Sequence, residues 1–217
     1  MKKSLLALGI ATTLMSGVAN AHEAGSWIVR AGGIFVSANS SSHTNTAVDV
    51  KLNVSDNQQL GLTGTYMFTD NIGVELLAAT PFSHSIDARV PALADKGALG
   101  ETVKVKQLPP SLYVQYYFLD KDAGSRPYIG AGINYTRFFD ATIKNDVISD
   151  LRVKKHSVGP VLNAGIDIKL TDSLYFNTAL WYTHIRTKAN FKALGKEHEV
   201  AIKLDPLVAF AGLAYHF

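Results

Sequence analysis

Eight segments of the chain alternate strictly between apolar residues and polar or small ones, and this pattern limits the folds open to it. In the C-terminal segment, for example, Leu213, Tyr215 and Phe217 fall on one face and His216 on the other. A period of two is that of a β-strand, and about ten residues is the length that a tilted strand needs to cross a bilayer. The pattern predicts an all-β chain with long strands at 27–36, 59–68, 72–82, 112–118, 128–136, 157–168, 174–185 and 207–217.

The connections between these strands alternate in length. Tight polar turns are expected at 69–71, 120–126 and 170–173. The other connections are long, at 38–57, 83–106, 140–155 and 188–203. Outer-membrane barrels have short periplasmic turns and long extracellular loops, and an even strand number leaves both termini in the periplasm. We therefore predict an eight-stranded antiparallel transmembrane β-barrel with four long extracellular loops, integral to the bacterial outer membrane.

Composition and aromatic placement agree with a barrel. The chain is 47% hydrophobic and only 18% charged, against about 25% charged in soluble proteins. After the first twenty residues, however, no apolar run approaches the 18 or so residues of a spanning helix. Alternation explains both facts, because apolar residues reach the lipid one at a time. Aromatic residues on the apolar faces also adjoin the short turns, as in a headgroup-level girdle: Tyr66, Phe68, Tyr116, Phe118, Tyr215 and Phe217.

Residues 1–21 have the three parts of a secretory signal peptide. Lys2 and Lys3 precede the apolar stretch 4–15, and Ala19 and Ala21 provide small residues for cleavage. We expect one barrel domain at 22–217 after cleavage. Loss of the two lysines lowers the formal charge from +3 to +1, and no basic run remains, so a nucleic-acid partner is not expected. The absence of cysteine excludes disulfides, thiolate metal sites and a lipid anchor.

The faces turned away from lipid would fill the barrel interior. The polar members are expected to form a compensated network: Arg30, Glu75, Gln115, Asn134, Asp167 and Asn177. The same faces carry apolar residues, Met67, Leu77, Val161, Trp181 and Phe210. A water-filled pore would have a polar lining. The residues alone leave two interpretations open, either ordinary packing of a closed barrel or an apolar lumen narrowed mid-strand at Leu77 and Trp181.

Several blocks of the sequence resemble the OmpW family of outer-membrane proteins. They are Gln59–Thr63, Tyr66–Met67, Thr69–Phe82, Leu108–Pro110, Arg126–Thr136 with Phe138–Asp140, Leu204–Pro206, His22–Gly25 and Arg30–Gly32. The resemblance implies an eight-stranded barrel with a hydrophobic lumen, through which small hydrophobic molecules pass. It also implies that Leu77 and Trp181 narrow that lumen, whereas Met67, Val161 and Phe210 are assigned to its lining by strand parity. Pro160 departs from the family pattern and puts strand pairing in doubt there, because proline lacks a ladder donor.

We therefore predict passive passage of small hydrophobic molecules. Pro81, Pro109 and Pro110 flank one outer loop, and their missing N–H groups suggest weakened pairing and lateral exit into the bilayer. Simple trimming of a strand edge is the other interpretation of these prolines. Phe217 at the C-terminus resembles the signal read by the barrel-assembly machinery.

Two other classes of function compete with passage. A surface receptor for adhesion, phage or bacteriocin binding is the alternative, since four long loops would be displayed. An enzyme is not predicted, because His184 is the one lipid-facing candidate base and no nucleophile accompanies it. The histidines at 43, 84, 156, 198 and 216 show no metal-ligand spacing, so neither a metal nor a cofactor is expected.

Overall fold

A computed structural model describes residues 22–37, 40–44, 51–89, 98–144, 148–193 and 196–217. The predicted signal peptide lies outside these residues. Within them, every regular element is a β-strand, and no helix is long and apolar enough to cross a membrane.

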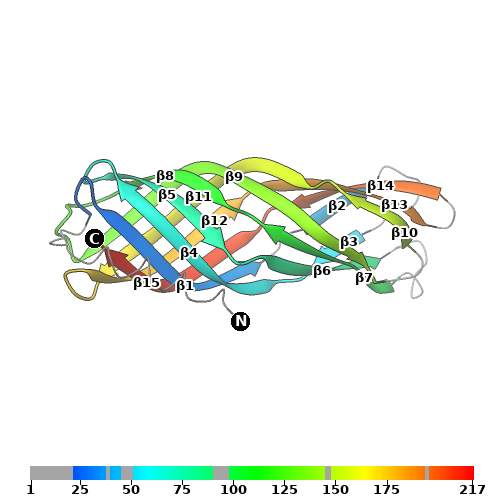
Figure 1. The fold of residues 1–217 in the computed structure, drawn as a ribbon, viewed down its shortest axis with the longest axis horizontal. Coiled ribbons are helices and arrows are strands. Elements are labelled where there is room, and N and C mark those ends of the chain that lie inside the picture. The colour runs from blue at the N-terminus through cyan, green and yellow to red at the C-terminus, as the bar shows by residue number, and fades with distance from the viewer. Residues whose placement is uncertain (1–21, 38–39, 45–50, 90–97, 145–147, 194–195) are drawn as a thin grey trace, which may run out of the picture.

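Eight strands close into an antiparallel barrel (Figure 1). They are β1 (Trp27–Ser37), β4 (Asn57–Met67), β5 (Ile72–Ala79), β8 (Ser111–Tyr117), β9 (Ser125–Ile143), β11 (His156–Lys169), β12 (Leu174–Thr183) and β15 (Leu207–His216). Each of these strands pairs with the next one along the chain, and β15 pairs with β1 to close the wall. The predicted fold class is confirmed.

The long connections contain strands that the sequence analysis did not predict. These are β2 (Ser40–Thr44), β3 (Lys51–Val54), β6 (Phe82–Arg89), β7 (Ala98–Leu108), β10 (Ile148–Val153), β13 (Ile185–Ala193) and β14 (Lys196–Leu204). β7, β6 and β3 continue the barrel sheet from β9, and β10-β13-β14-β2 form a separate sheet (Figure 1). Both extend the barrel away from the short turns. We call this part the outer extension. Its strands form because alternation continues through them, as at Val200, Ile202 and Leu204, all of which are buried.

Most wall strands are interrupted where the barrel meets the outer extension. The described breaks fall at Ser55–Asp56, Thr80–Pro81, Pro109–Pro110, Lys154–Lys155, His184 and Asp205–Pro206. Among the described residues, β9 alone is assigned as one strand across this level, with 19 residues. Three of the breaks contain proline, which has no N–H for the ladder. Pro160, in contrast, lies inside β11 and is paired with Ile133 of β9, so pairing to that neighbour is continuous.

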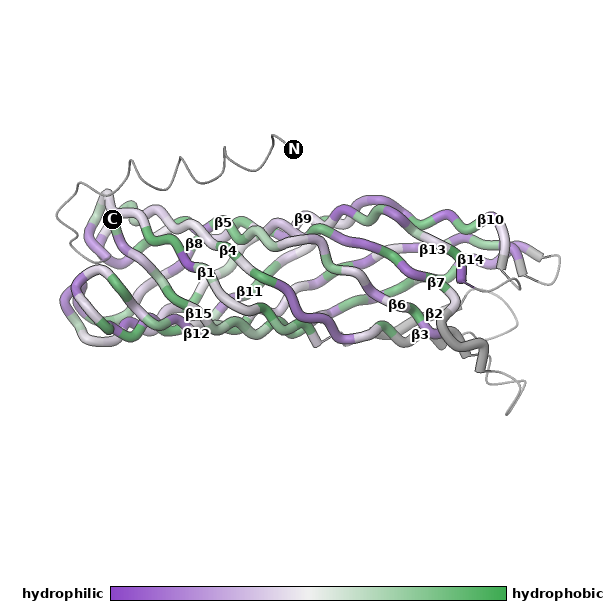
Figure 2. The backbone as a smooth tube through the Cα atoms, turned by 60° about the horizontal axis from the view of Figure 1, so that its bottom comes forward, coloured by the Kyte–Doolittle hydropathy of each residue, from purple (hydrophilic) through white to green (hydrophobic). Residues whose placement is uncertain are grey.

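The outer surface of the barrel carries the expected apolar and aromatic residues. Phe68 is 61% exposed and Leu62 53% exposed, as lipid-facing side chains should be. Neighbouring rings of the girdle lie in contact, with centroids 5.2 Å apart for Tyr116–Phe118 and 4.9 Å apart for Tyr215–Phe217. Figure 2 shows hydrophobic residues recurring along this end of the molecule, while long hydrophilic stretches follow strands such as β6 in the outer extension. The bilayer therefore surrounds the end that carries the C-terminus.

Candidate functional site: the barrel lumen

A buried ion cluster occupies the lower lumen. The Arg30 guanidinium donates to Glu75 Oε2 at 2.6 Å and to Asp167 Oδ2 at 2.6 Å, and its Nε donates to Asp167 Oδ1 at 3.1 Å. All three side chains are at most 1% exposed. They come from β1, β5 and β11, so one cation links three parts of the wall. An unpaired charge in this interior would be strongly unfavourable, whereas the two-sided pairing compensates it.

Neutral hydrogen bonds complete this cluster. Thr65 donates to Glu75 Oε2 at 2.7 Å, and Gln115 donates to Glu75 Oε1 at 3.1 Å. Asn177 donates to Asp167 Oδ1 at 2.7 Å and to the Tyr128 hydroxyl at 2.9 Å. All four carboxylate oxygens therefore accept hydrogen bonds. We call this set, with Arg30 and Tyr117, the polar layer.

Asn134 lies apart from the polar layer, although the sequence analysis grouped it there. Its amide donates to Ser111 Oγ at 2.9 Å and to the carbonyls of Pro109 at 3.2 Å and Pro110 at 3.3 Å. It is 1% exposed. Asn134 thus satisfies backbone acceptors at the break between β7 and β8. Its inward face follows from strand parity, but its height in the barrel does not.

Apolar side chains pack inside the wall above the polar layer. Trp181 is 2% exposed, its Nε1 donates to the Tyr113 hydroxyl at 2.8 Å, and its ring meets Phe210 edge-on at 5.9 Å between centroids. Leu77, at 8% exposed, and Val161 belong to the same packed cluster. Leu77 and Trp181, which the sequence analysis assigned to the narrowing, are therefore both buried in this cluster. We call Trp181, Leu77, Val161 and Phe210 the apolar layer.

Met67 occupies a different level from the other apolar lumen residues. It is fully buried and pairs with Gly73 next to the β4–β5 turn, and its carbonyl accepts a hydrogen bond from Gly25 at 2.7 Å. Met67 is thus near the floor of the barrel, whereas Val161 and Phe210 lie near Trp181.

The outer extension has its own apolar interior. Its buried residues form a second cluster, composed of Val54, Val105, Phe138, Ile185, Ala189, Val200, Ile202 and Leu204. A belt of buried polar side chains, including Thr136, Ser157 and Thr183, lies among the breaks between the two clusters. The interior is therefore apolar for much of its length on the outer side of the polar layer.

The wall is weakly paired at the predicted prolines. The last β5–β8 pair is Leu77 with Ser111, and the first β6–β7 pair is Phe82 with Gln107. Residues 78–81 and 108–110 between them, which include Pro81, Pro109 and Pro110, have no partners in this ladder. We call this stretch the proline gap.

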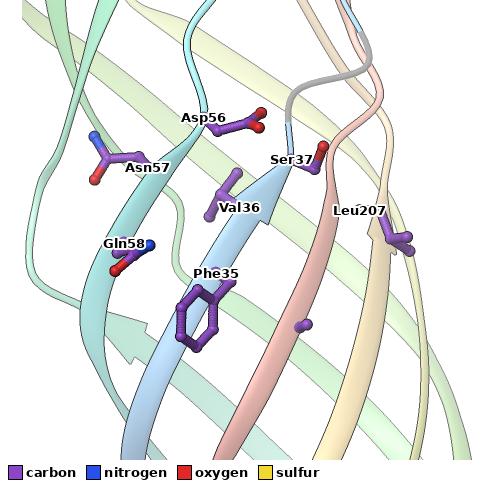
Figure 3. A pocket seen from close by; sticks show the side chains of 8 residues that line it. Phe35, Val36, Ser37, Asp56, Asn57, Gln58 and Leu207 are labelled. Atoms are coloured by element: carbon purple, nitrogen blue, oxygen red, sulfur yellow. The ribbon is translucent and has the colours of Figure 1, made fainter.

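A groove of about 560 Å³ opens on the wall at the outer end of β1 (Figure 3). It lies where β1 stops pairing with β4 and β15, at Val36–Asn57 and Ser37–Leu207. Phe35 and Leu207 on its rim are each 49% exposed. Phe35 is eight residues beyond Trp27, which is about 20 Å along the barrel axis for a tilted strand. The groove therefore lies near the outer boundary of the apolar band.

Sequence reasoning missed several residues of the lower lumen. Arg126 was placed in a turn, but it is fully buried in β9 and donates to the carbonyls of Asp70 at 2.8 Å and Leu119 at 3.0 Å. His22 precedes the first strand and shows no periodicity, yet it is fully buried beside Asp167. Strand parity could have indicated Tyr117, which donates to Gln115 from the inward face of β8.

Comparisons with known proteins agree with this architecture. The sequence model of the OmpW family matches residues 23–217. Outer membrane protein W of Vibrio cholerae serotype O1 is 42% identical over 221 aligned residues that cover 100% of both chains. Two solved structures are also similar. The outer membrane protein OprG from Pseudomonas aeruginosa superposes with a TM-score of 0.82 at 35% identity, over 92% of this chain and 99% of that one. The E. coli Outer Membrane Protein W gives a TM-score of 0.62 at 41% identity, over 90% of this chain and 100% of that one.

Proposed function

The chain belongs to the OmpW family of outer-membrane proteins, and on that basis we propose that it passes small hydrophobic molecules through the outer membrane. In this proposal the protein is a passive route rather than an enzyme. Outer-membrane lipid surrounds it, and the solute moves inward from the outer extension.

One observation carries the proposal: above the polar layer the interior holds two apolar clusters, one inside the barrel and one in the outer extension, separated only by a belt of polar side chains. Trp181, Phe210 and Val161 are at most 2% exposed and face the lumen rather than the lipid. A porin lining would be polar, because it has to hold water. An apolar lining instead favours a solute that loses little by leaving water. Leu77 and Trp181 are the side chains that such a solute would have to displace.

The polar layer supports a lateral exit. An apolar solute moving on towards the periplasm would have to separate Arg30 from Glu75 and Asp167, both held at 2.6 Å. Separating a buried ion pair is costly. The proline gap lies above this layer, where the ladder is already interrupted. We therefore place the exit into the bilayer between β5 and β8, at Pro81, Pro109 and Pro110.

Substitution of Trp181 tests the narrowing. Trp181→Ala should raise uptake of N-phenylnaphthylamine, an apolar fluorescent dye, several-fold in cells that lack the wild-type protein, because it removes the largest side chain of the apolar layer. Trp181→Phe is the matched control. It keeps a large aromatic ring and gives up the hydrogen bond to Tyr113 and part of the ring volume, so uptake should change much less than in Trp181→Ala. Equal uptake by Trp181→Ala and wild type, at equal protein levels, would remove Trp181 from the route.

Restoration of a ladder donor tests the lateral exit. Pro110→Ala supplies an N–H at the proline gap, which should tighten pairing and slow dye uptake. Pro206→Ala is the matched control, because Pro206 lies at the break between β14 and β15. An unchanged rate of dye uptake in Pro110→Ala would contradict exit at the proline gap. If Ala209→Trp, which fills the groove at β1, then slowed uptake, the exit would lie at the groove.

We also propose that Phe217 presents the C-terminal signal to the barrel-assembly machinery. Its backbone exchanges hydrogen bonds with Trp27, at 2.9 and 3.3 Å, which pairs the chain end to β1 at barrel closure. Recognition of phage or bacteriocin by the outer connections remains the alternative function. The apolar interior of the outer extension favours passage, since a surface used only for display would not need such a lining.

A further inference from the structure

Three metal-ligating side chains meet at the floor of the barrel. His22, Asp167 and His216 come from the N-terminal segment, β11 and β15, and one ligand atom of each lies within 4.8 Å of the other two. All three are fully buried. The sequence analysis predicted no metal site, because 194 positions separate the two histidines along the chain and barrel closure alone brings them together.

The two imidazoles lack the hydrogen bonds that buried histidines normally make. His22 Nδ1 and both ring nitrogens of His216 are buried and have no hydrogen-bond partner. Their rings face one another at 4.3 Å between centroids, and Tyr175 covers His216 at 4.1 Å. Buried polar nitrogens without partners are rare in folded proteins and point to a missing ligand.

The bond to Asp167 determines which nitrogen of His22 is free. His22 Nε2 lies 3.0 Å from Asp167 Oδ2, and the carboxylate is ion-paired with Arg30, so it can only accept. Nε2 therefore carries the proton, and Nδ1 presents its lone pair. A carboxylate that orients a histidine in this way is the usual outer shell of a protein-bound metal ion.

We propose that His22 and His216 bind a transition-metal cation of the zinc or copper type, with Asp167 orienting His22. Imidazole nitrogen suits these ions better than it suits magnesium or calcium. Ligand atoms around zinc are about 3.3 Å apart when the metal–nitrogen distance is about 2.0 Å, so ligation would bring one nitrogen of each ring to that separation.

Processing of the chain would add a third nitrogen. If cleavage follows Ala21 as predicted, His22 becomes the first residue, and its free α-amino group joins Nδ1 of the same residue in a six-membered chelate. Arg30 is paired with both Glu75 and Asp167, and Arg126 donates to backbone carbonyls, so these two cations are matched in number by two carboxylates.

The site would fasten the N-terminal segment to the barrel floor. At the turn side this segment is otherwise held by the backbone hydrogen bond from Gly25 to Met67 at 2.7 Å, by Ala24 N donating to Asp70 at 2.9 Å and by the Lys121–Glu23 ion pair at 3.2 Å. The last two contacts are at the surface, so local opening there gives a metal ion access from the periplasmic side. The proposal does not depend on hydrophobic passage.

Zinc titration tests the site. The mature protein, without a histidine tag and folded in detergent micelles, should bind one Zn²⁺ with micromolar or tighter affinity by calorimetry. His22→Asn and His216→Asn should each weaken binding at least about tenfold. His156→Asn is the matched control, because His156 is exposed and stacks on Tyr135 away from the floor.

Copper spectroscopy keeps the test valid if a variant does not fold. Wild-type protein loaded with one Cu²⁺ should show superhyperfine splitting from at least two nitrogens in its electron paramagnetic resonance spectrum. Blocking the α-amino group should reduce the number of coupled nitrogens. Three results would overturn the proposal: no binding by the folded wild type, wild-type affinity in both His22→Asn and His216→Asn, or copper bound through oxygen alone. The first of these would assign the unpartnered nitrogens to a buried water.

Discussion

At the scale of single residues, Arg30 determines how the lower lumen is built. One guanidinium serves Glu75 and Asp167, and the two carboxylates in turn order Thr65, Gln115 and Asn177. Parity predicted that the charged members face inward, because each lies on the more polar face of its strand. Parity predicted the inward face of Asn134 but not its level in the barrel, which is at the break between β7 and β8.

Removal of Arg30 should therefore destabilise the barrel strongly. Arg30→Met leaves two buried carboxylates uncompensated, and we expect a loss of about 3–5 kcal/mol in the free energy of unfolding. Urea titration of the protein in lipid vesicles, followed by tryptophan fluorescence, measures this loss. Lys106→Met is the control, since Lys106 pairs with Asp140 at the surface and should matter little. Equal urea midpoints for the two variants would contradict the role given to Arg30.

At the scale of elements, β-structure extends into the segments that were predicted as outer loops, whereas β5 and β12 end before their predicted ends. The segments expected as outer loops continue the alternation, and β6, β7, β13 and β14 bury their inward residues in the outer extension. Lysines and other charged residues between the apolar positions made these segments look like solvated loops. A strand with one polar and one apolar face has the same composition, so only the pairing partners distinguish the two.

Acid should loosen the outer extension through His84. This residue lies in β6, beyond the break at Pro81, and bonds the Ser55 carbonyl through Nδ1 at 2.9 Å. Burial lowers the pKa of His84 below its ordinary value, against the raising effect of the Ser55 carbonyl. The unfolded segment then takes up a proton more readily than the folded one. Its contribution to stability is full above pH 6.5 and decreases as the pH falls below that value.

Hydrogen exchange checks this expectation. The Ser85 amide, which donates to Ser55 Oγ at 3.2 Å, should exchange faster at pH 5 than at pH 7.5 after correction for intrinsic rates. His84→Gln should lose most of this difference, while His156→Gln should keep it. The same acid effect in His84→Gln and wild type would assign it to another group.

At the scale of the whole molecule, two levels of the barrel mark the two boundaries of the bilayer's apolar band. The aromatic girdle marks the inner level, and the row of strand breaks marks the outer one. β9 is continuous across the outer level, with Ile133 within the apolar band and Ile143 in the outer extension. This one strand therefore has residues in the lipid and residues in the aqueous phase outside it.

Charge placed on β9 should report this boundary. Ile133 is 62% exposed and lies four residues beyond Ile129 along β9. Ile129 is paired with the girdle residue Tyr116. Ile133→Arg puts a cation about 10 Å into the band and should cost about 2–4 kcal/mol in vesicles, because lipid cannot solvate it. Ile143→Arg, on the same strand, should cost far less. Similar losses for the two substitutions would move the outer boundary beyond Ile143.

The sequence by itself determined the fold class, the number of wall strands and the face on which each wall residue lies. These follow from a period of two, which is written into the order of residues. Only the tertiary structure decided which inward side chains share a level, since neighbouring strands in a barrel are staggered by an amount that no single strand encodes. That stagger separates Met67 and Asn134 from the layers in which parity had grouped them. It also brings His22 and His216 together at the floor, from opposite ends of the chain.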